Sequence, residues 1–314
     1  MRTRFAPSPT GDLHLGGAYT ALAAWWLARS SAGTAVLRVE DLDRPRTVPG
    51  SEARQLEDLA WLGLDWDEGP FHQSERTAFY EAALADLVDA GRTYACDCSR
   101  AEIARVASAP HAGEEVVYPG TCRDADPARR MRRDPAIRLR IEPTDTADFV
   151  DGVRGAVGGG LLQAGGDFVL RRADGVFAYQ LAVAADDLAM GVTAIPRGDD
   201  LLASTPRQLL LMQLWRTRGR LPWAPQQGQP YPRYFHLPLV RAEDGSRLAK
   251  RTPRSTIREL RAEGVRPAAV VGRLAAALGL LPSPEELTST ELLARAPAGV
   301  PFSPEPWCAP RRWG

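Results

Sequence analysis

Residues 2–43 read RTRFAPSPTGDLHLGGAYTALAAWWLARSSAGTAVLRVEDLD, and this stretch decides the fold class. Its first residues are extended, and Pro7 and Pro9 end them because proline fixes φ and excludes helix. Apolar residues then recur with helical spacing over residues 15–29. Residues 35–39 are mainly apolar and β-branched, and the chain turns acidic at Glu40. The pattern is strand, loop, helix, strand.

Such a unit normally forms a right-handed crossover between parallel strands, and ligands collect at the carboxyl ends of those strands. Two further helices are expected, with start signals at Ser51 and Ser74 and a stop at Gly91. Strand and helix character returns over residues 168–188 and again over residues 206–215. We therefore predict an α/β protein with a Rossmann-like parallel sheet, interrupted by an inserted module and followed by a C-terminal helical segment.

Composition narrows the function. The chain has 314 residues and no net charge, so only a local patch would attract a polyanion. It has no signal-peptide core and no apolar run long enough to span a bilayer, so we expect no membrane association. Its four cysteines do not resemble a secreted disulfide framework, and a cytoplasmic location fits best. Lys250, the only lysine, lies between Ala249 and Arg251, which excludes a P-loop.

The loop APSPTGDLHLGG, residues 6–17, precedes the first helix. Backbone N–H groups and the dipole at a helix N-terminus favour an anion, and a histidine such as His14 can donate a hydrogen bond to phosphate. Glycines such as Gly16 and Gly17 let a ligand approach the backbone closely. Taken alone, His14 is as readily explained as a helix-start residue without a chemical role.

The order of motifs resolves this ambiguity. The sequence resembles the glutamyl-type class I aminoacyl-tRNA synthetases, whose HIGH-type signature matches PSPTG-x-x-H-x-G at residues 7–16. Their KMSKS-type signature matches RLAKR at residues 247–251. RVEDLD, FAYQLA and PRGDDLL stand between the two in the expected order, so the resemblance extends from residue 4 to about residue 260. The resemblance implies a class I synthetase fold that uses Mg-ATP as a substrate.

Roles for individual residues come with this resemblance. It implies that His14 and Lys250 are catalytic, and that His14, Gly16, Gly17 and Lys250 bind ATP. A compact ammonium on a loop can follow charge as it moves to the leaving pyrophosphate. The glutamate substrate would contact Arg4, Phe5, Ala6, Pro7, Ser8, Glu40, Tyr179 and Arg197. Of these, Glu40 would take the α-ammonium, and Arg197 with Tyr179 would hold a carboxylate. Arg247 and Ala249 depart from the signature, which puts their own contributions in doubt.

A cysteine cluster lies in the interrupting segment. Cys96, Cys98 and Cys122 fall within 27 residues and suggest a structural zinc that needs one more ligand. Chemistry alone nominates His111 or the distant Cys308 as that ligand, and reduced cysteines without metal are the plain alternative. The small glutamyl-queuosine synthetases have C-x-C followed by Y-x-x-x-C. This resemblance implies the ligand set Cys96, Cys98, Tyr118 and Cys122. An arginine run over residues 129–140 is either a solvated face or a contact for an RNA backbone.

Four segments are expected: residues 1–90, the first half of the nucleotide-binding domain; 91–167, an acceptor-type module with the zinc cluster; 168–235, the second half; and 236–314, the KMSKS-type loop, a helical segment and the tail. Residues 251–314 leave no room for the large anticodon-binding region of a glutamyl-tRNA synthetase. The chain thus resembles the glutamyl-queuosine tRNA(Asp) synthetases, which attach activated glutamate to the queuosine base of the anticodon loop.

The expected reaction therefore uses L-glutamate, ATP and queuosine-bearing tRNA(Asp), and we expect a monomer. Three other functions stay open. A glutamyl-tRNA synthetase fragment would charge the tRNA 3′ end. An adenylate-forming ligase would pass the aminoacyl group to a small amine. A non-catalytic zinc-containing module would bind RNA without ATP–pyrophosphate exchange.

Overall fold

The structure is a computed structural model of the 314-residue chain. It describes residues 1–106, 117–158, 161, 166–224, 230–245, 255–296, 299, 302–310 and 313. Lys250, Arg247, Ala249 and His111 lie outside these ranges.

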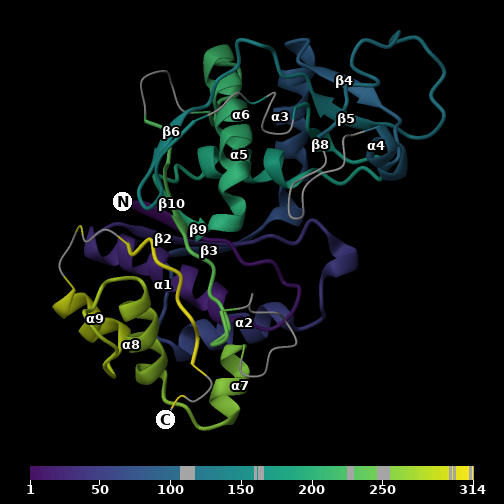
Figure 1. Ribbon diagram of the computed structural model, residues 1–314. Coiled ribbons are helices and arrows are strands. Elements are labelled where there is room, and N and C mark those ends of the chain that lie inside the picture. The colour runs from purple at the N-terminus through teal and green to yellow at the C-terminus, as the bar shows by residue number, and fades with distance from the viewer. Residues whose placement is uncertain are drawn as a thin grey trace.

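Five parallel strands form the central sheet (Figure 1). They are β1 (Arg2–Phe5), β2 (Thr34–Val39), β3 (Glu68–His72), β9 (Ala194–Gly198) and β10 (Arg233–Leu237), in the order β10-β9-β1-β2-β3. The first crossover runs through α1 (Leu15–Ser30), which begins after the proline-rich loop as expected. Residues on most sides of α1 are buried, because the helix packs on the sheet and is itself covered by later helices.

Helices cover both faces of this sheet. Four of them, together with a short 3-10 helix, continue the nucleotide-binding pattern: α2 (Ser51–Trp61), η2 (Gln73–Arg76), α3 (Thr77–Asp89), α5 (Tyr179–Ala189) and α6 (Thr205–Arg218). One apolar core lies around α1, and a second joins α3, α5 and α6. Two further short 3-10 helices, η1 (Arg44–Arg46) and η3 (Asp199–Ser204), follow the ends of β2 and β9.

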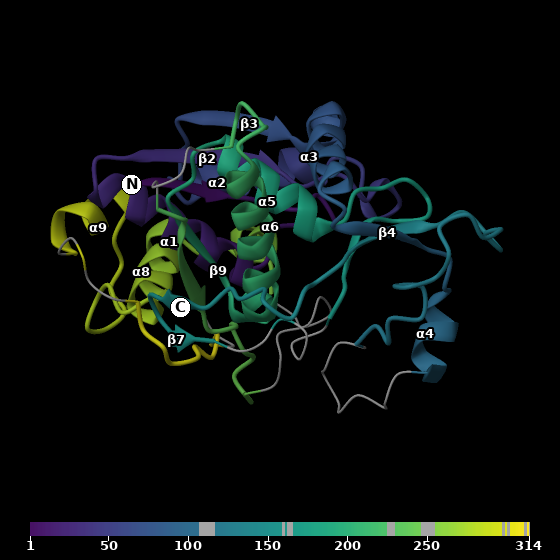
Figure 2. The same cartoon turned by 90° about the horizontal axis from the view of Figure 1, so that it is seen from above.

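A smaller antiparallel sheet lies to one side of the molecule, as Figure 2 shows for β4 and α4. It consists of β4 (Thr93–Cys96), β5 (Ala136–Leu139) and β8 (Val169–Arg171), with α4 (Arg100–Val106) beside it. The hairpin β6 (Phe149–Asp151) and β7 (Gly155–Val157) leaves this region and contacts β10 of the parallel sheet. An interruption of the large sheet was predicted, and the elements from β4 to β8 lie between its strands β3 and β9 in the sequence.

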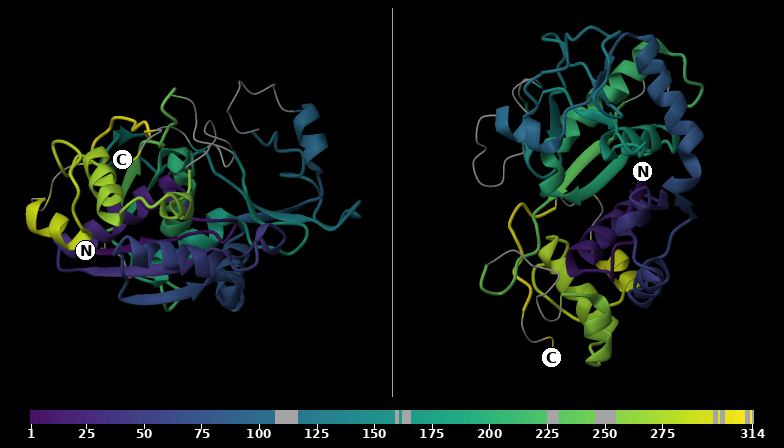
Figure 3. Two further views of the ribbon diagram at one scale, coloured as in Figure 1. Left: turned by 90° about the horizontal axis from the view of Figure 1, so that it is seen from below. Right: turned by 90° about the vertical axis from the view of Figure 1, so that its right-hand side faces the viewer.

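The C-terminal helices are α7 (Ile257–Ala262), α8 (Pro267–Ala277) and α9 (Ser289–Arg295). Helices α8 and α9 pack on α1, at the opposite end of the molecule from α4 in both views of Figure 3. Thr256 with Glu259, and Thr288 with Glu291, form capping boxes that satisfy the first N–H groups of α7 and α9. Across the described residues, no helix combines the length and apolar character needed to cross a bilayer.

Candidate active site

A cavity of about 570 Å³ opens at the carboxyl ends of the parallel strands. This volume falls within the range of roughly 300–1,000 Å³ typical of small-molecule sites. Its walls come from the segments that follow β1, β2, β9 and β10. The cavity is lined by every residue that the sequence nominated for glutamate or ATP within the described ranges: Arg4, Phe5, Ala6, Pro7, Ser8, His14, Gly16, Gly17, Glu40, Tyr179 and Arg197.

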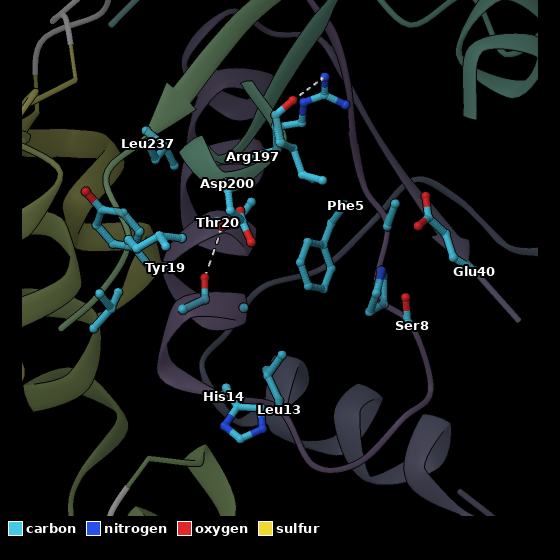
Figure 4. Close-up of a pocket in the computed structure, with 18 of the residues that line it drawn as sticks. Phe5, Ser8, Leu13, His14, Tyr19, Thr20, Glu40, Arg197, Asp200 and Leu237 are labelled. Atoms are coloured by element: carbon cyan, nitrogen blue, oxygen red, sulfur yellow. Dashed lines mark hydrogen bonds between the residues drawn. The ribbon is translucent and has the colours of Figure 1, made fainter. Parts of the chain in front are cut away.

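The N-terminus of α1 forms the floor of the cavity. His14 is the N-cap residue of the helix, and no acidic side chain lies in the first turn. A Cβ added at Gly16 would meet no atom within 4 Å, so this glycine leaves the space beside the helix N-terminus open. Figure 4 shows His14 at one side of the cavity and Arg197 and Glu40 at the other. Free space at a helix N-terminus suits the phosphates of a nucleotide.

The loop before α1 is joined to the chain that follows the KMSKS-type stretch. The Leu15 N–H donates to the Ser255 carbonyl at 2.9 Å, and the Ile257 N–H donates to the Leu13 carbonyl at 2.9 Å. His14 and Thr256 form a bridge of antiparallel type between them. The described chain thus resumes next to His14, shortly after the position of Lys250 in the sequence. The role predicted for Lys250 itself stays a prediction.

Buried charges lie under the wall that carries Glu40. Arg38 is fully buried; it donates to Asp187 at 2.7 Å and to Glu40 at 3.3 Å. The Arg4 Nε also approaches Asp187, at 3.4 Å. Burial alone would raise the pKa of Asp187, but Arg38 and Arg4 outweigh it and hold that pKa below the ordinary value. Asp187 is therefore an anion that fixes two arginines.

The pKa of Glu40 is shifted in the opposite direction from that of Asp187. Burial raises its pKa, and the nearby Arg38 and Arg4 lower it only partly, so the net shift is upward. The carboxylate would be favoured again by a cation in the cavity, such as the α-ammonium of an amino acid. Tyr179, at the start of α5, lines the same cavity, and burial raises the pKa of its hydroxyl, which keeps it a hydrogen-bond donor.

Arg197, in β9, is held entirely by neutral groups. Its side chain is buried and donates to His236 Nε2 at 3.1 Å, to Gln208 at 2.8 Å and to Thr205 at 2.6 Å. No ion pair joins it to a carboxylate within the described part of the chain. A buried guanidinium without an anionic partner favours an incoming carboxylate, because burial makes an uncompensated charge costly.

The sequence reasoning missed four charged or titratable residues: Arg38, Asp187, His236 and Asp151, whose carboxylate lies 2.6 Å from His236 Nδ1. The sequence did carry a signal for two of these four residues. Arg38 interrupts an apolar strand, and Asp187 stands inside the apolar helix α5. Charged residues at buried positions require partners. No sequence signal identified His236 or its partner Asp151.

The three cysteines of the interrupting segment come together. The sulfur atoms of Cys96, Cys98 and Cys122 all lie within 4.8 Å of one another, and the three residues could hold a metal ion. The Tyr118 hydroxyl lies 3.4 Å from the Cys96 sulfur and 3.9 Å from the Cys98 sulfur. It also accepts the Cys122 N–H at 2.8 Å. Cys308 is exposed and is not part of this group.

Arginines of the 129–140 run surround this cluster but are largely engaged within the protein. Arg129 and Arg132 hold the buried carboxylate of Asp97, and Arg129 also donates toward the Cys122 sulfur at 3.4 Å. The guanidinium of Arg138 lies over the Tyr118 ring at 3.8 Å. These arginines therefore support the cysteine cluster, which reduces the number available to contact RNA.

Comparison with known proteins identifies the family. Residues 1–295 match the family described as tRNA synthetases class I (E and Q), catalytic domain. The chain is 47% identical over 307 residues to the glutamyl-Q tRNA(Asp) synthetase of Symbiobacterium thermophilum, covering 92% of this chain and 90% of that protein. It is 48% identical over 310 residues to the enzyme of the same name from Nocardia farcinica, covering 97% and 91%. The chain belongs to the glutamyl-Q tRNA(Asp) synthetase family.

The fold comparison agrees. A crystal structure of glutamate-tRNA synthetase from Elizabethkingia anophelis superposes with a TM-score of 0.79 at 24% identity, covering 99% of this chain and 68% of that chain. The family resemblance and the α/β synthetase fold predicted from the sequence are thus confirmed. Membership in the glutamyl-Q tRNA(Asp) synthetase family makes the protein a ligase of the aminoacyl-tRNA synthetase class, whose substrates are glutamate, ATP and tRNA.

Proposed function

We propose that the protein activates L-glutamate with Mg-ATP and transfers the glutamyl group to the queuosine base in the anticodon loop of tRNA(Asp). The observation that carries this proposal is the charge pattern of the cavity. Arg4 and Arg197 and the carboxylate of Glu40 line one space beside the N-terminus of α1. Glutamate brings one ammonium and two carboxylates, so its charges complement this set while the helix N-terminus receives the nucleotide phosphates.

In the first step, an oxygen of the glutamate α-carboxylate attacks the α-phosphorus of ATP. A carboxyl–phosphate bond forms, the bond to the bridging oxygen breaks, and pyrophosphate leaves with the charge. No protein nucleophile is needed, so the residues act by positioning and by charge stabilisation. In this scheme His14 and Lys250 stabilise the phosphates, with Gly16 and Gly17 opening the approach. In the second step, a hydroxyl group of the queuosine base attacks the acyl carbon, the bond between that carbon and the phosphate oxygen breaks, AMP leaves, and the hydroxyl proton passes to solvent.

Glutamate would be held at three points. Glu40 accepts hydrogen bonds from the α-ammonium, while Arg197 and Tyr179 hold a carboxylate. The segment Arg4 to Ser8 forms the wall along the substrate. Glutamate is favoured over glutamine when Arg197 receives the side-chain carboxylate, because the amide of glutamine would leave that buried charge unpaired.

A structural zinc would hold the cysteine cluster together. The compact group of three sulfurs with the Tyr118 hydroxyl beside it fits a four-coordinate ion, and Cys96, Cys98, Tyr118 and Cys122 would be its ligands. The ion would fix β4 and the chain around Cys122 relative to each other. We further propose that the protein acts as a monomer, which size-exclusion chromatography with light scattering measures directly.

The test begins with ATP–pyrophosphate exchange, run with glutamate, glutamine and aspartate in the absence of tRNA. We expect exchange with glutamate alone. Radiolabelled glutamate is then offered to tRNA(Asp) carrying queuosine or guanosine, each with and without the 3′-terminal adenosine. Transfer that needs queuosine and survives loss of the terminal adenosine supports the proposal.

Each rival gives a different outcome. Transfer that needs the terminal adenosine indicates charging of the tRNA 3′ end. Exchange without transfer to either RNA indicates a ligase for a small amine. RNA binding without exchange with any of the three amino acids indicates a non-catalytic module and rejects the proposal.

A further inference from the structure

A chain of buried hydrogen bonds leads from the β6 hairpin to Arg197. Asp151, the last residue of β6, lies 2.6 Å from His236 Nδ1 through its Oδ2 atom. His236, in β10, accepts a hydrogen bond at Nε2 from Arg197 Nε at 3.1 Å. The side chains of Asp151 and His236 are completely inaccessible to solvent. The first of these residues belongs to the segment that interrupts the parallel sheet, and the last lines the cavity.

The proton positions in this chain follow from its partners. The Asp151 Oδ1 atom accepts the N–H groups of Val153 and Arg154, both at 2.9 Å, and the backbone N–H of His236 donates to both carboxylate oxygens, at 3.2 and 3.1 Å. Burial raises the pKa of Asp151, but its hydrogen bonds from His236, Arg154 and Val153 outweigh that effect, and the residue is a carboxylate. Burial lowers the pKa of His236, so the imidazole is neutral. A neutral ring facing a carboxylate carries its proton on Nδ1, which leaves Nε2 as an acceptor.

This tautomer matches what Arg197 needs. A guanidinium has five N–H donors and accepts nothing. Arg197 uses four of them within the described residues, on His236, Gln208, Thr205 and the Leu201 carbonyl. The Thr205 hydroxyl also lies 3.0 Å from His236 Nε2, so Arg197, Thr205 and His236 all contact one another. One N–H on Nη1 remains for a ligand, and the other four contacts fix its direction.

We propose that Asp151 and His236 are positioning residues that hold Arg197 in the orientation in which it receives a carboxylate of the substrate. The inference rests on the proposed binding of glutamate and deepens it. The hairpin residue selects the imidazole tautomer, and the tautomer in turn fixes the guanidinium. Neither residue needs to touch the substrate.

The deciding variant is Asp151→Asn, which changes one atom. Its Oδ1 can keep the N–H groups of Val153 and Arg154 and the backbone N–H of His236, which lies 3.2 Å away. Its NH₂ then occupies the position of Oδ2, gives up the 3.1 Å contact with that backbone N–H and donates to His236 Nδ1. The ring proton must move to Nε2, where it opposes the Arg197 Nε–H. We expect the KM for glutamate in ATP–pyrophosphate exchange to rise about 10- to 100-fold, the loss typical of one charge-assisted hydrogen bond. The KM for ATP should be unchanged.

Substitutions of His236 separate positioning from folding. His236→Gln keeps an acceptor near Arg197, whereas His236→Leu removes it, so the rise in glutamate KM should be smaller for Gln. In the His236→Gln background, Asp151→Asn should have little further effect, because no tautomer remains to be inverted. A purely structural aspartate would instead give additive effects. Asp174→Asn is the matched control, since Asp174 also accepts a turn N–H, from Val176, but has no link to Arg197.

The outcomes are distinct. Wild-type protein without glutamate-dependent exchange overturns the proposed function before any variant is compared. Wild-type exchange, with an unchanged glutamate KM in Asp151→Asn, overturns the inference alone. If Asp151→Asn does not fold, the ratio between His236→Gln and His236→Leu decides: equal glutamate KM values overturn the inference.

Discussion

Replacing Glu40 by glutamine separates substrate binding from stability. The amide has the shape of the carboxylate but cannot offer a charge-assisted bond to an ammonium. A hydrogen bond to a charged group contributes about 1.5–3 kcal/mol, and each 1.4 kcal/mol is a factor of ten in affinity. If Glu40 holds the α-ammonium, Glu40→Gln raises the KM for glutamate by roughly 10- to 150-fold. The KM for ATP stays near the wild-type value.

The same substitution should not destabilise the protein. Arg38 keeps Asp187 at 2.7 Å and Asp186 at 3.6 Å when Glu40 is neutralised. Because burial raises the pKa of Glu40, its ionised form is disfavoured in the fold, and stability falls as pH rises through that pKa. Glutamine removes this unfavourable term, so the midpoint of thermal unfolding at neutral pH should be equal to that of the wild type or higher.

The assay is ATP–pyrophosphate exchange with glutamate and ATP varied in turn, beside thermal unfolding of the same samples. Glu68→Gln is the matched control, because Glu68 pairs with Arg2 at 2.5 Å between two strands of the same sheet but does not line the cavity. Its glutamate KM should equal that of the wild type. If Glu40→Gln also leaves the glutamate KM unchanged, the assignment of the ammonium to Glu40 is refuted.

Three further results are expected. Lys250→Ala should lower kcat by about 100-fold without changing the unfolding midpoint, since one contact to developing phosphate charge contributes on the order of 3 kcal/mol; an unchanged kcat would contradict the catalytic role. Cys122→Ser should reduce the zinc content per chain measured by atomic absorption, while Cys308→Ser should not. Asp187→Asn should lower the free energy of unfolding by about 3–5 kcal/mol at pH 7, because it breaks a buried pair, against less than about 1 kcal/mol for the exposed Glu57→Gln. The Asp187 contribution is present above the unfolded pKa of about 3.9 and is lost as pH falls through the lower folded pKa, so urea unfolding at pH 3 should show a smaller difference.

Much of the fold was predictable because its signals are local. Strand β1, helix α1 and strand β2 follow directly from prolines, helical periodicity and a β-branched run. Strand β3 was missed: it reads EGPFH, is largely exposed and contains Gly-Pro, so its composition is that of a turn. Helix α9 was not predicted separately from the tail, although Thr288 and Glu291 carry a capping-box signal. In β3, pairing at the edge of the sheet outweighed composition, and in α9, packing against α8 and α1 did so.

The candidate site likewise contains residues that the sequence could identify and residues that it could not. Glu40 could be nominated because it directly follows a strand and the loops of a parallel sheet meet at one edge, whereas the segment 4–8 was nominated through the family resemblance. The buried groups that contact Arg197 could not be nominated. His236 and Asp151 are far apart in the sequence, and only the folded chain places their side chains in contact. Pairings of this kind depend on how two elements dock, and a single sequence carries no periodic signal for docking.

The β6 hairpin has a consequence for engineering chimeric synthetases. Asp151 belongs to the segment that interrupts the parallel sheet, which is a natural unit to exchange between synthetases. The neighbouring Gly152 N–H donates to the Tyr234 carbonyl at 2.8 Å and so joins this segment to β10 of the parallel sheet. A graft with junctions outside residues 149–157 would replace the hairpin whose Asp151 contacts His236, the hydrogen-bond partner of Arg197. If Asp151 positions Arg197 as proposed, a graft that retains the recipient's own residues 149–157 would leave its amino-acid recognition intact.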